Sequence, residues 1–178
     1  MVEFVSQRNT CYSEIGCGVA ACMMLLKTAG YNTPNTFKEM GDLLCVDVPP
    51  GKKWGKKFTN YGHGAYARDI TKYLENNKIP YINIADERKH KISWASLNKL
   101  ISLAPVMVGV IDKEDADKWT DGGHWVVLVE KVAGGKFAYY DPDYTKYKFA
   151  NTVAPTMTTN ELKNWWDGCA IVVLPGEN

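Results

Sequence analysis

The fold is decided by one stretch of the sequence, Gly16-Cys17-Gly18-Val19-Ala20-Ala21-Cys22-Met23-Met24-Leu25-Leu26. It is rich in good helix formers and is followed by Gly30, a residue type that commonly ends helices. Because the run is apolar on every side, it predicts a helix in the middle of a domain rather than one on its surface. We therefore expect a central buried helix that begins near Cys17.

Cys17 occupies a favourable position for reactivity in this predicted helix. A cysteine at a helix N-terminus faces unpaired backbone N–H groups and the positive end of the helix dipole. Both favour the thiolate, which is the form of the side chain that attacks carbonyl carbons. The alternative is that Cys17 is simply a small buried hydrophobic residue, as most free cysteines are. This stretch alone does not decide between the two interpretations.

Length and composition indicate an ordinary globular protein. The chain has 178 residues, enough for a sizeable core, so we predict a single domain spanning residues 1–178. The net charge of +1 favours neither a nucleic-acid nor a membrane partner. No apolar run has membrane-spanning length, and residues 1–16 lack the pattern of a secretory signal. We therefore expect a cytoplasmic protein.

The cysteines support the same location. The sequence has five of them, at positions 11, 17, 22, 45 and 169, without paired or metal-type spacing. This pattern favours reduced thiols over a disulfide framework or a zinc site. We therefore predict no metal ion, and nothing in the sequence calls for a cofactor.

The remaining segments predict several helices and a sheet. Helices are expected at 36–44, 65–76 and 93–103, and another is expected after the capping box of Thr158 and Glu161. Strands are expected at 2–5, 81–84, 105–111, 125–132, 137–140 and 169–174. This order predicts an α+β fold, in which an N-terminal helical part with the central buried helix packs on a C-terminal antiparallel sheet.

Three histidines are available as a catalytic base for Cys17. His90 lies in a charged patch and is a poor candidate, whereas His63 lies in a glycine-flanked loop and stays open as an alternative. His124 begins an apolar strand after Gly122-Gly123, so the strand would hold its ring at the edge of a sheet. The alternative for His124 is a hydrogen-bonded, half-buried histidine without a catalytic role.

Asp141 lies at the far end of the same predicted hairpin as His124. With a two-residue turn at Gly134-Gly135, Asp141 would pair with residue 128, about 13 Å along the strand from His124. Strand twist, a bulge or a longer loop is therefore needed to bring the two side chains together. Asp141-Pro142-Asp143 can also be an ordinary turn that Asp141 begins. Gln7 offers an amide N–H₂ to an oxyanion, but without this context it would be an ordinary surface glutamine.

Several motifs follow one another in a fixed order along nearly the whole chain: Gln7, Cys17-Gly18-Val19-Ala20-Ala21, a glycine before Tyr31, Gly122-Gly123-His124-Trp125-Val126-Val127, Asp141-Pro142 and Trp166-Asp167-Gly168. In this order they resemble the double-glycine peptidase family. These papain-like cysteine peptidases process bacteriocin leaders, usually as the N-terminal domain of ABC exporters. The resemblance implies a papain-like fold with Cys17 as nucleophile, His124 as base, Asp141 as its orienting partner and Gln7 in the oxyanion hole.

The sequence departs from this family in two respects. The segment between Gln7 and Cys17 is a few residues longer and contains Cys11. It must loop out for Gln7 to reach the nucleophile, and Cys11 becomes a minor rival of Cys17. The second departure is the lack of a transporter. It suggests a freestanding processing peptidase, or a toxin or effector domain of a larger secreted protein that acts in the cytoplasm of a target cell.

These observations predict a cysteine peptidase that cleaves a cytosolic protein after Gly-Gly in a flexible segment. Gly122 and Gly123 would let a substrate backbone approach closely, and Trp125 would narrow the pocket. The expected partners are a protein substrate and an immunity protein or inhibitor. A short basic stretch at 52–57 is interpreted as a solvated loop, which argues against nucleic-acid binding.

Two alternatives stay open. The same triad could catalyse glutamine deamidation or acyl transfer, because an amine as well as water can resolve an acyl-enzyme. An inactive binding module is also conceivable, but a binding groove would require none of the four predicted site residues.

Overall fold

The computed structural model describes residues 1–8, 10, 15–44, 46, 64–84, 94–110, 123–143 and 154–176. Over these ranges the elements follow one another as α1 (Cys17–Thr28), α2 (Phe37–Leu43), α3 (Ala67–Asn76), β1 (Tyr81–Ile84), α4 (Trp94–Ile101), β2 (Val106–Val110), β3 (His124–Val132), β4 (Lys136–Tyr140), β5 (Thr156–Thr158), α5 (Thr159–Trp165) and β6 (Trp166–Val173). The strands form one sheet in the order β1-β6-β2-β3-β4-β5, and every neighbouring pair is antiparallel. The predicted α+β class is confirmed. No helix in the described ranges is long and apolar enough to cross a membrane.

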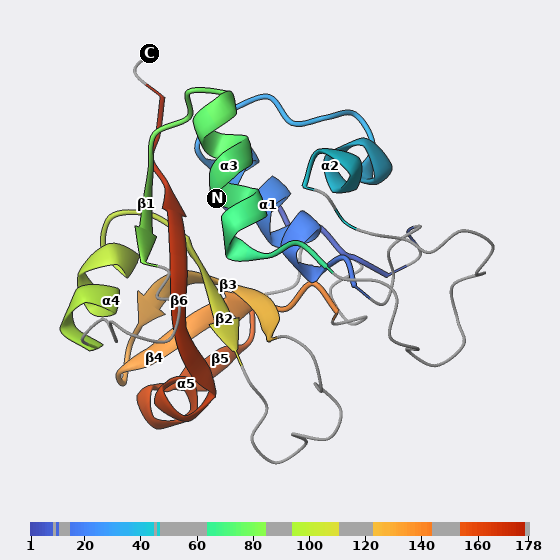
Figure 1. Cartoon of the computed structure of the whole chain (residues 1–178). Coiled ribbons are helices and arrows are strands. Elements are labelled where there is room, and N and C mark those ends of the chain that lie inside the picture. Colours follow the sequence, from blue (N-terminus) through green and yellow to red (C-terminus); the bar gives the residue numbers. More distant parts are fainter. Residues whose placement is uncertain are drawn as a thin grey trace.

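The sheet lies between two groups of helices (Figure 1). On β2, β3 and β6 odd-numbered residues such as Met107 and Val127 pack in one apolar cluster with residues of α1, α2 and α3. On the same strands even-numbered residues such as Val108 and Val126 pack in a second cluster with residues of α4 and α5. Successive side chains of a strand point to opposite faces, so a strand covered on both sides must be apolar throughout. This explains why every residue of β2 is buried.

The central buried helix predicted from the sequence is α1. Every residue from Gly18 to Leu26 is buried. The start of the helix fits tightly, because a Cβ on Gly18 would lie 3.0 Å from the Cβ of Ala65 and 3.1 Å from the ring of Trp125. Beyond its end Gly30 has a φ of 85°, the left-handed conformation that glycine adopts readily after helices. The packing therefore places the N-terminus of α1 firmly against β3.

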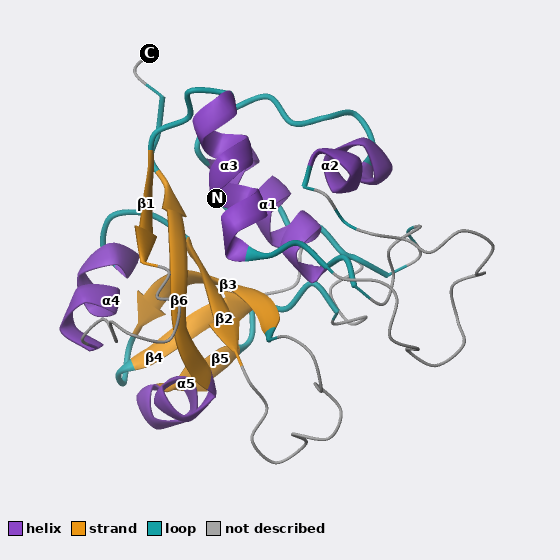
Figure 2. Cartoon of the chain, viewed as in Figure 1, coloured by secondary structure: helices purple, strands orange, loops and turns teal. Residues whose placement is uncertain are grey.

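The other predicted helices are present, whereas the strand predicted at 2–5 is absent (Figure 2). Residues 2–5 form no strand, because Phe4 and Val5 pack on the cluster around α1 instead of pairing with the sheet. The short edge strand β5 was not expected from its sequence, and it exists through its pairing with β4. The last strand also begins at Trp166, earlier than expected.

Candidate active site

The β3–β4 hairpin brings His124 and Asp141 into contact. Val132 pairs with Lys136, so residues 133–135 form the loop of the hairpin. A β-bulge between Leu128 and Glu130 then shifts the register of the two strands. The loop is one residue longer than a two-residue turn, and together with the bulge it places Asp141 nearer the start of β3. The side chain of Asp141 can therefore reach His124. His124 Nε2 lies 2.6 Å from Asp141 Oδ1.

Cys17 is the first residue of α1 and lies beside the same histidine. Its side chain is half-buried and lies close enough to His124 to help raise the pKa of the ring. Because Nε2 of the ring faces Asp141, Nδ1 is the nitrogen available to Cys17. The structure thus places Cys17 beside the hydrogen-bonded pair of His124 and Asp141. The array combines elements from both halves of the chain, the buried helix and the hairpin.

The electrostatics of this array favour a protonated histidine. His124 is only 6% exposed, and burial by itself lowers the pKa of its ring. The hydrogen bonds with Asp141 and Cys17, together with their charges, outweigh burial and raise the pKa to about 10. Burial likewise raises the pKa of Asp141, but the hydrogen bond and charge of His124, with smaller contributions from Asp143 and Arg8, lower it below its ordinary value. His124 and Asp141 therefore form an imidazolium–carboxylate pair at neutral pH.

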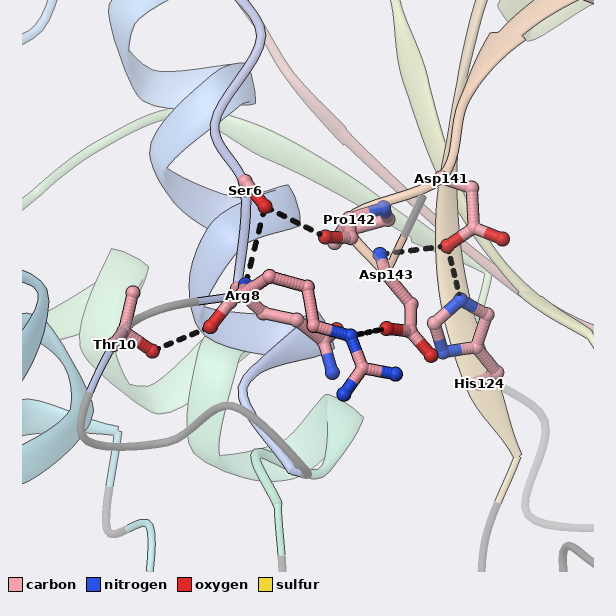
Figure 3. A network of polar contacts seen from close by, with 8 residues as sticks. Ser6, Arg8, Thr10, His124, Asp141, Pro142 and Asp143 are labelled. Carbon is pink, nitrogen blue, oxygen red and sulfur yellow. Dashed lines mark hydrogen bonds and ion pairs between the residues drawn. The ribbon is translucent and has the colours of Figure 1, made fainter. Parts of the chain in front are cut away.

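Gln7 lies in a segment that contacts the turn after β4. Its side chain is 2% exposed, so it is not an ordinary surface glutamine. Its backbone N–H donates to the carbonyl of Pro142 at 3.0 Å, and the Ser6 hydroxyl donates to the same carbonyl at 3.4 Å. The structure therefore holds the backbone of Gln7 directly against the residue that follows Asp141. Figure 3 draws the contact of Ser6 with Pro142 together with the His124–Asp141 pair.

Asp141 also begins a turn, as its sequence suggested. Its Oδ1 accepts the backbone N–H of Asp143 at 2.8 Å, in addition to the contact with His124. Asp143 in turn forms an ion pair with Arg8. This pair is not predicted by the sequence, because two charged residues in distant segments have no spacing that links them. The only available signal was that each lies within two residues of a predicted site residue.

Internal packing explains why the residue before His124 is a glycine. A Cβ on Gly123 would lie 3.2 Å from Oδ2 of Asp167 and 3.2 Å from the carbonyl of Val110. Trp125 is 8% exposed, and its indole N–H donates to the carbonyl of Ala65 at 3.1 Å. Both residues therefore have roles inside the protein that do not require a substrate.

Other residues considered in the sequence fall outside the described ranges. They are Cys11, Cys45, His63, His90, Gly122 and the basic stretch 52–57. Among the described residues, no three His, Cys, Asp or Glu side chains are placed to hold a metal ion.

Solved structures with a similar fold include peptidase domains. The chain is similar to the peptidase domain of Streptococcus ComA, a bi-functional ABC transporter involved in a quorum-sensing pathway, with a TM-score of 0.63 and 18% identity over 99% of this chain and 100% of that chain. It is also similar to a double glycine motif protease from an AMS/PCAT transporter in complex with its leader peptide, with a TM-score of 0.58 and 16% identity over 99% of this chain and 93% of that one.

No protein-family model and no curated protein matches the sequence. At these identities the likeness concerns the fold, which is that of papain-like, double-glycine peptidase domains. The fold class predicted from the sequence is therefore confirmed.

Proposed function

We propose that this chain, as one catalytic domain, is a cysteine peptidase. The observation that carries the proposal is that Cys17, at the N-terminus of the buried helix, lies beside the hydrogen-bonded pair of His124 and Asp141. A thiol, a base and a group that orients the base are the parts that nucleophilic catalysis requires. An inactive binding module would need none of them. The fold shared with peptidase domains agrees with this assignment.

The proposed reaction begins with attack of Cys17 Sγ on the carbonyl carbon of the scissile peptide bond. The side-chain amide of Gln7 and the backbone N–H groups at the start of α1 stabilise the oxyanion that forms. The His124 imidazolium then gives its proton to the leaving amine, and an acyl-enzyme remains on the sulfur. Neutral His124 next takes a proton from water, whose oxygen attacks the thioester and releases the acid. Asp141 holds the ring in position throughout.

We further propose that cleavage follows Gly-Gly in a flexible, exposed segment of a protein or peptide. The support is that one of the similar structures is a double glycine motif protease bound to a leader peptide. Glycines keep a peptide flexible and leave no side chain to be accommodated before the scissile bond. Replacing the second glycine by valine should lower kcat/KM on the order of a hundredfold, a loss of ~3 kcal/mol of transition-state stabilisation.

The test is N-terminal sequencing of the fragments produced from an unbiased protein lysate, with the Cys17→Ala variant as control. We expect new N-termini that follow Gly-Gly in the wild-type sample and none in the control. Bulky residues before the break, without enrichment of glycine, would contradict the specificity and leave the triad standing. A small increase in the mass of a target without a chain break would instead support deamidation.

Three finer expectations stay predictions. They are a substrate in the cytosol, a role as a toxin or effector, and an immunity protein as partner. Comparing the proteomes of cells that express the wild type and the Cys17→Ala variant would reveal the substrate.

A further inference from the structure

The ion pair of Arg8 and Asp143 joins two segments that each carry a residue of the candidate site. Arg8 follows Gln7 directly, and Asp143 ends the turn that Asp141 begins. Both charged side chains are half-buried, at 33% and 28% exposure, so water screens their attraction only in part. The chain between these segments is long, which makes the pair a tertiary contact rather than a local turn.

Hydrogen bonds within each segment and between the two segments surround this pair, and Figure 3 draws the bonds of Ser6 with Pro142 and Arg8 and that of Asp143 with Asp141. The N–H of Gln7 donates to the carbonyl of Pro142 at 3.0 Å, and the N–H of Asp143 donates to Asp141 Oδ1 at 2.8 Å. On the other segment, the N–H of Arg8 donates to the Ser6 hydroxyl at 3.1 Å. A shift of either segment would therefore be felt by both Gln7 and Asp141.

We propose that Arg8 and Asp143 are positioning residues, whose ion pair locks the segment of Gln7 onto the turn of Asp141. The oxyanion donor and the carboxylate that orients His124 are then held as one unit. The inference rests on the proposed function, because it assigns the pair a role in that same site. Arg8 and Asp143 themselves act through Gln7 and Asp141 and take no part in the chemical steps.

The charges around Asp141 give the pair a second effect. Asp141 faces His124 on β3, Asp143 in its own turn and Arg8 in the N-terminal segment, and Cys17 on α1 lies beyond the histidine. The charge of Arg8 contributes to the lowered pKa of Asp141. Loss of Arg8 should therefore make Asp141 easier to protonate.

The test compares Arg8→Met, which keeps the apolar stem, and Asp143→Asn, which keeps the shape and the backbone N–H, with the double variant. We expect each single variant to lower kcat for a Gly-Gly peptide about ten- to a hundredfold, with KM nearly unchanged, because misplacement affects the chemical step. The double variant should be no worse than the poorer single variant, because both remove one interaction. Arg8→Met should also move the acidic limb of the pH–rate profile to higher pH, and Arg8→Lys should restore part of the rate.

A matched control is Lys27→Met. Lys27 Nζ lies 2.6 Å from Glu3 Oε1, so this pair also ties the N-terminal segment to another element, but it does so at the last turn of α1. The control should leave kcat and the pH profile unchanged. The proposal is overturned if Arg8→Met and Asp143→Asn keep the wild-type kcat, if their effects fall on KM alone, or if they multiply in the double variant.

A measurement without substrate separates this inference from the proposed function. Iodoacetamide should alkylate Cys17 more slowly at mildly acidic pH in Arg8→Met than in the wild type, because a misplaced Asp141 supports the imidazolium less well. If Arg8→Met is alkylated more slowly but the wild type cleaves no peptide, the positioning role of Arg8 is supported and the proposed peptidase function is rejected. Equal alkylation rates, in variants that the thermal unfolding transition shows to be folded, would reject the positioning role.

Discussion

Cys17 and Cys22 lie in the same helix, but their surroundings give them different chemistry. Cys17 stands at the first position of α1, is half-buried and lies beside His124. Cys22 lies in the middle of the helix with no exposed surface, and burial raises the pKa of its thiol to about 12. The thiol of Cys22 therefore stays protonated and serves as part of the apolar core.

The two cysteines share one helix and differ in their position along it. The start of a helix offers free N–H groups and the positive end of its dipole, whereas in the middle those groups bond to carbonyls. The hairpin then adds His124 and Asp141 beside the first position only. The following predictions test this difference, from the largest expected effect to the smallest.

Removal of the thiol should have the largest effect at position 17 and a small one at position 22. Cys17→Ala should lower kcat on the order of a millionfold, because no nucleophile is left. Cys22→Ala should keep kcat and lower the free energy of unfolding by about 1 kcal/mol, as expected for a small loss of core packing. The measurements are hydrolysis of a Gly-Gly peptide and urea unfolding. If the Cys17→Ala variant still hydrolyses the peptide, Cys17 is not the nucleophile and does not differ from Cys22 in function.

His124→Ala should be about as damaging as Cys17→Ala. The two residues act as one unit, so the double variant should be hardly worse than either single variant. Comparing kcat in the two single variants and the double variant checks this, and multiplied losses would show that Cys17 and His124 work independently.

Asp141→Asn should have a smaller effect, about a hundredfold in kcat, because the amide oxygen can still accept the Nε2–H of His124. The negative charge that supports the imidazolium is lost, so the bell-shaped pH–rate profile should also narrow. A wild-type profile in this variant would mean that Asp141 serves only to begin its turn. The measurement is kcat from steady-state kinetics of both proteins across the pH range.

The pH dependence of stability should report His124. Its pKa is raised in the folded protein from 6.5 to about 10, so the folded state binds the proton more tightly than the unfolded state does. The resulting stabilisation is complete below pH 6.5 and is lost as the pH rises toward 10. The urea midpoint of the wild type should therefore fall between pH 6.5 and 9, and that of His124→Gln should fall less. Equal slopes in the two proteins would contradict the raised pKa.

Local sequence patterns predicted the elements that depend on local chemistry. The apolar run from Gly18 to Leu26 indicated a buried helix, and Thr158 with Glu161 indicated the start of α5. The pattern failed where tertiary pairing decides the outcome. The segment 2–5 looks like a strand but packs on helices, and β5 is too short to show a pattern of its own.

The candidate site was also predictable only where local sequence patterns determine the structure. Cys17, His124 and Asp141 stand at recognisable places, namely a helix start and the two ends of a hairpin. The contact between His124 and Asp141 required a bulge that the residues do not reveal, so the sequence could only show that one was needed. Arg8 and Asp143 could not be predicted, because their meeting depends on how the first segment crosses the end of the sheet.

The most direct test of the central claim is the mapping of one covalent label. A peptide chloromethyl ketone that ends in Gly-Gly is incubated with the protein, and the modified cysteine is identified by mass spectrometry of its proteolytic fragments. We predict modification of Cys17, none of Cys22, and loss of the label in the His124→Ala variant. A label on Cys11 or Cys22 with Cys17 unmodified, or labelling of Cys17 that is unchanged without His124, would contradict the account.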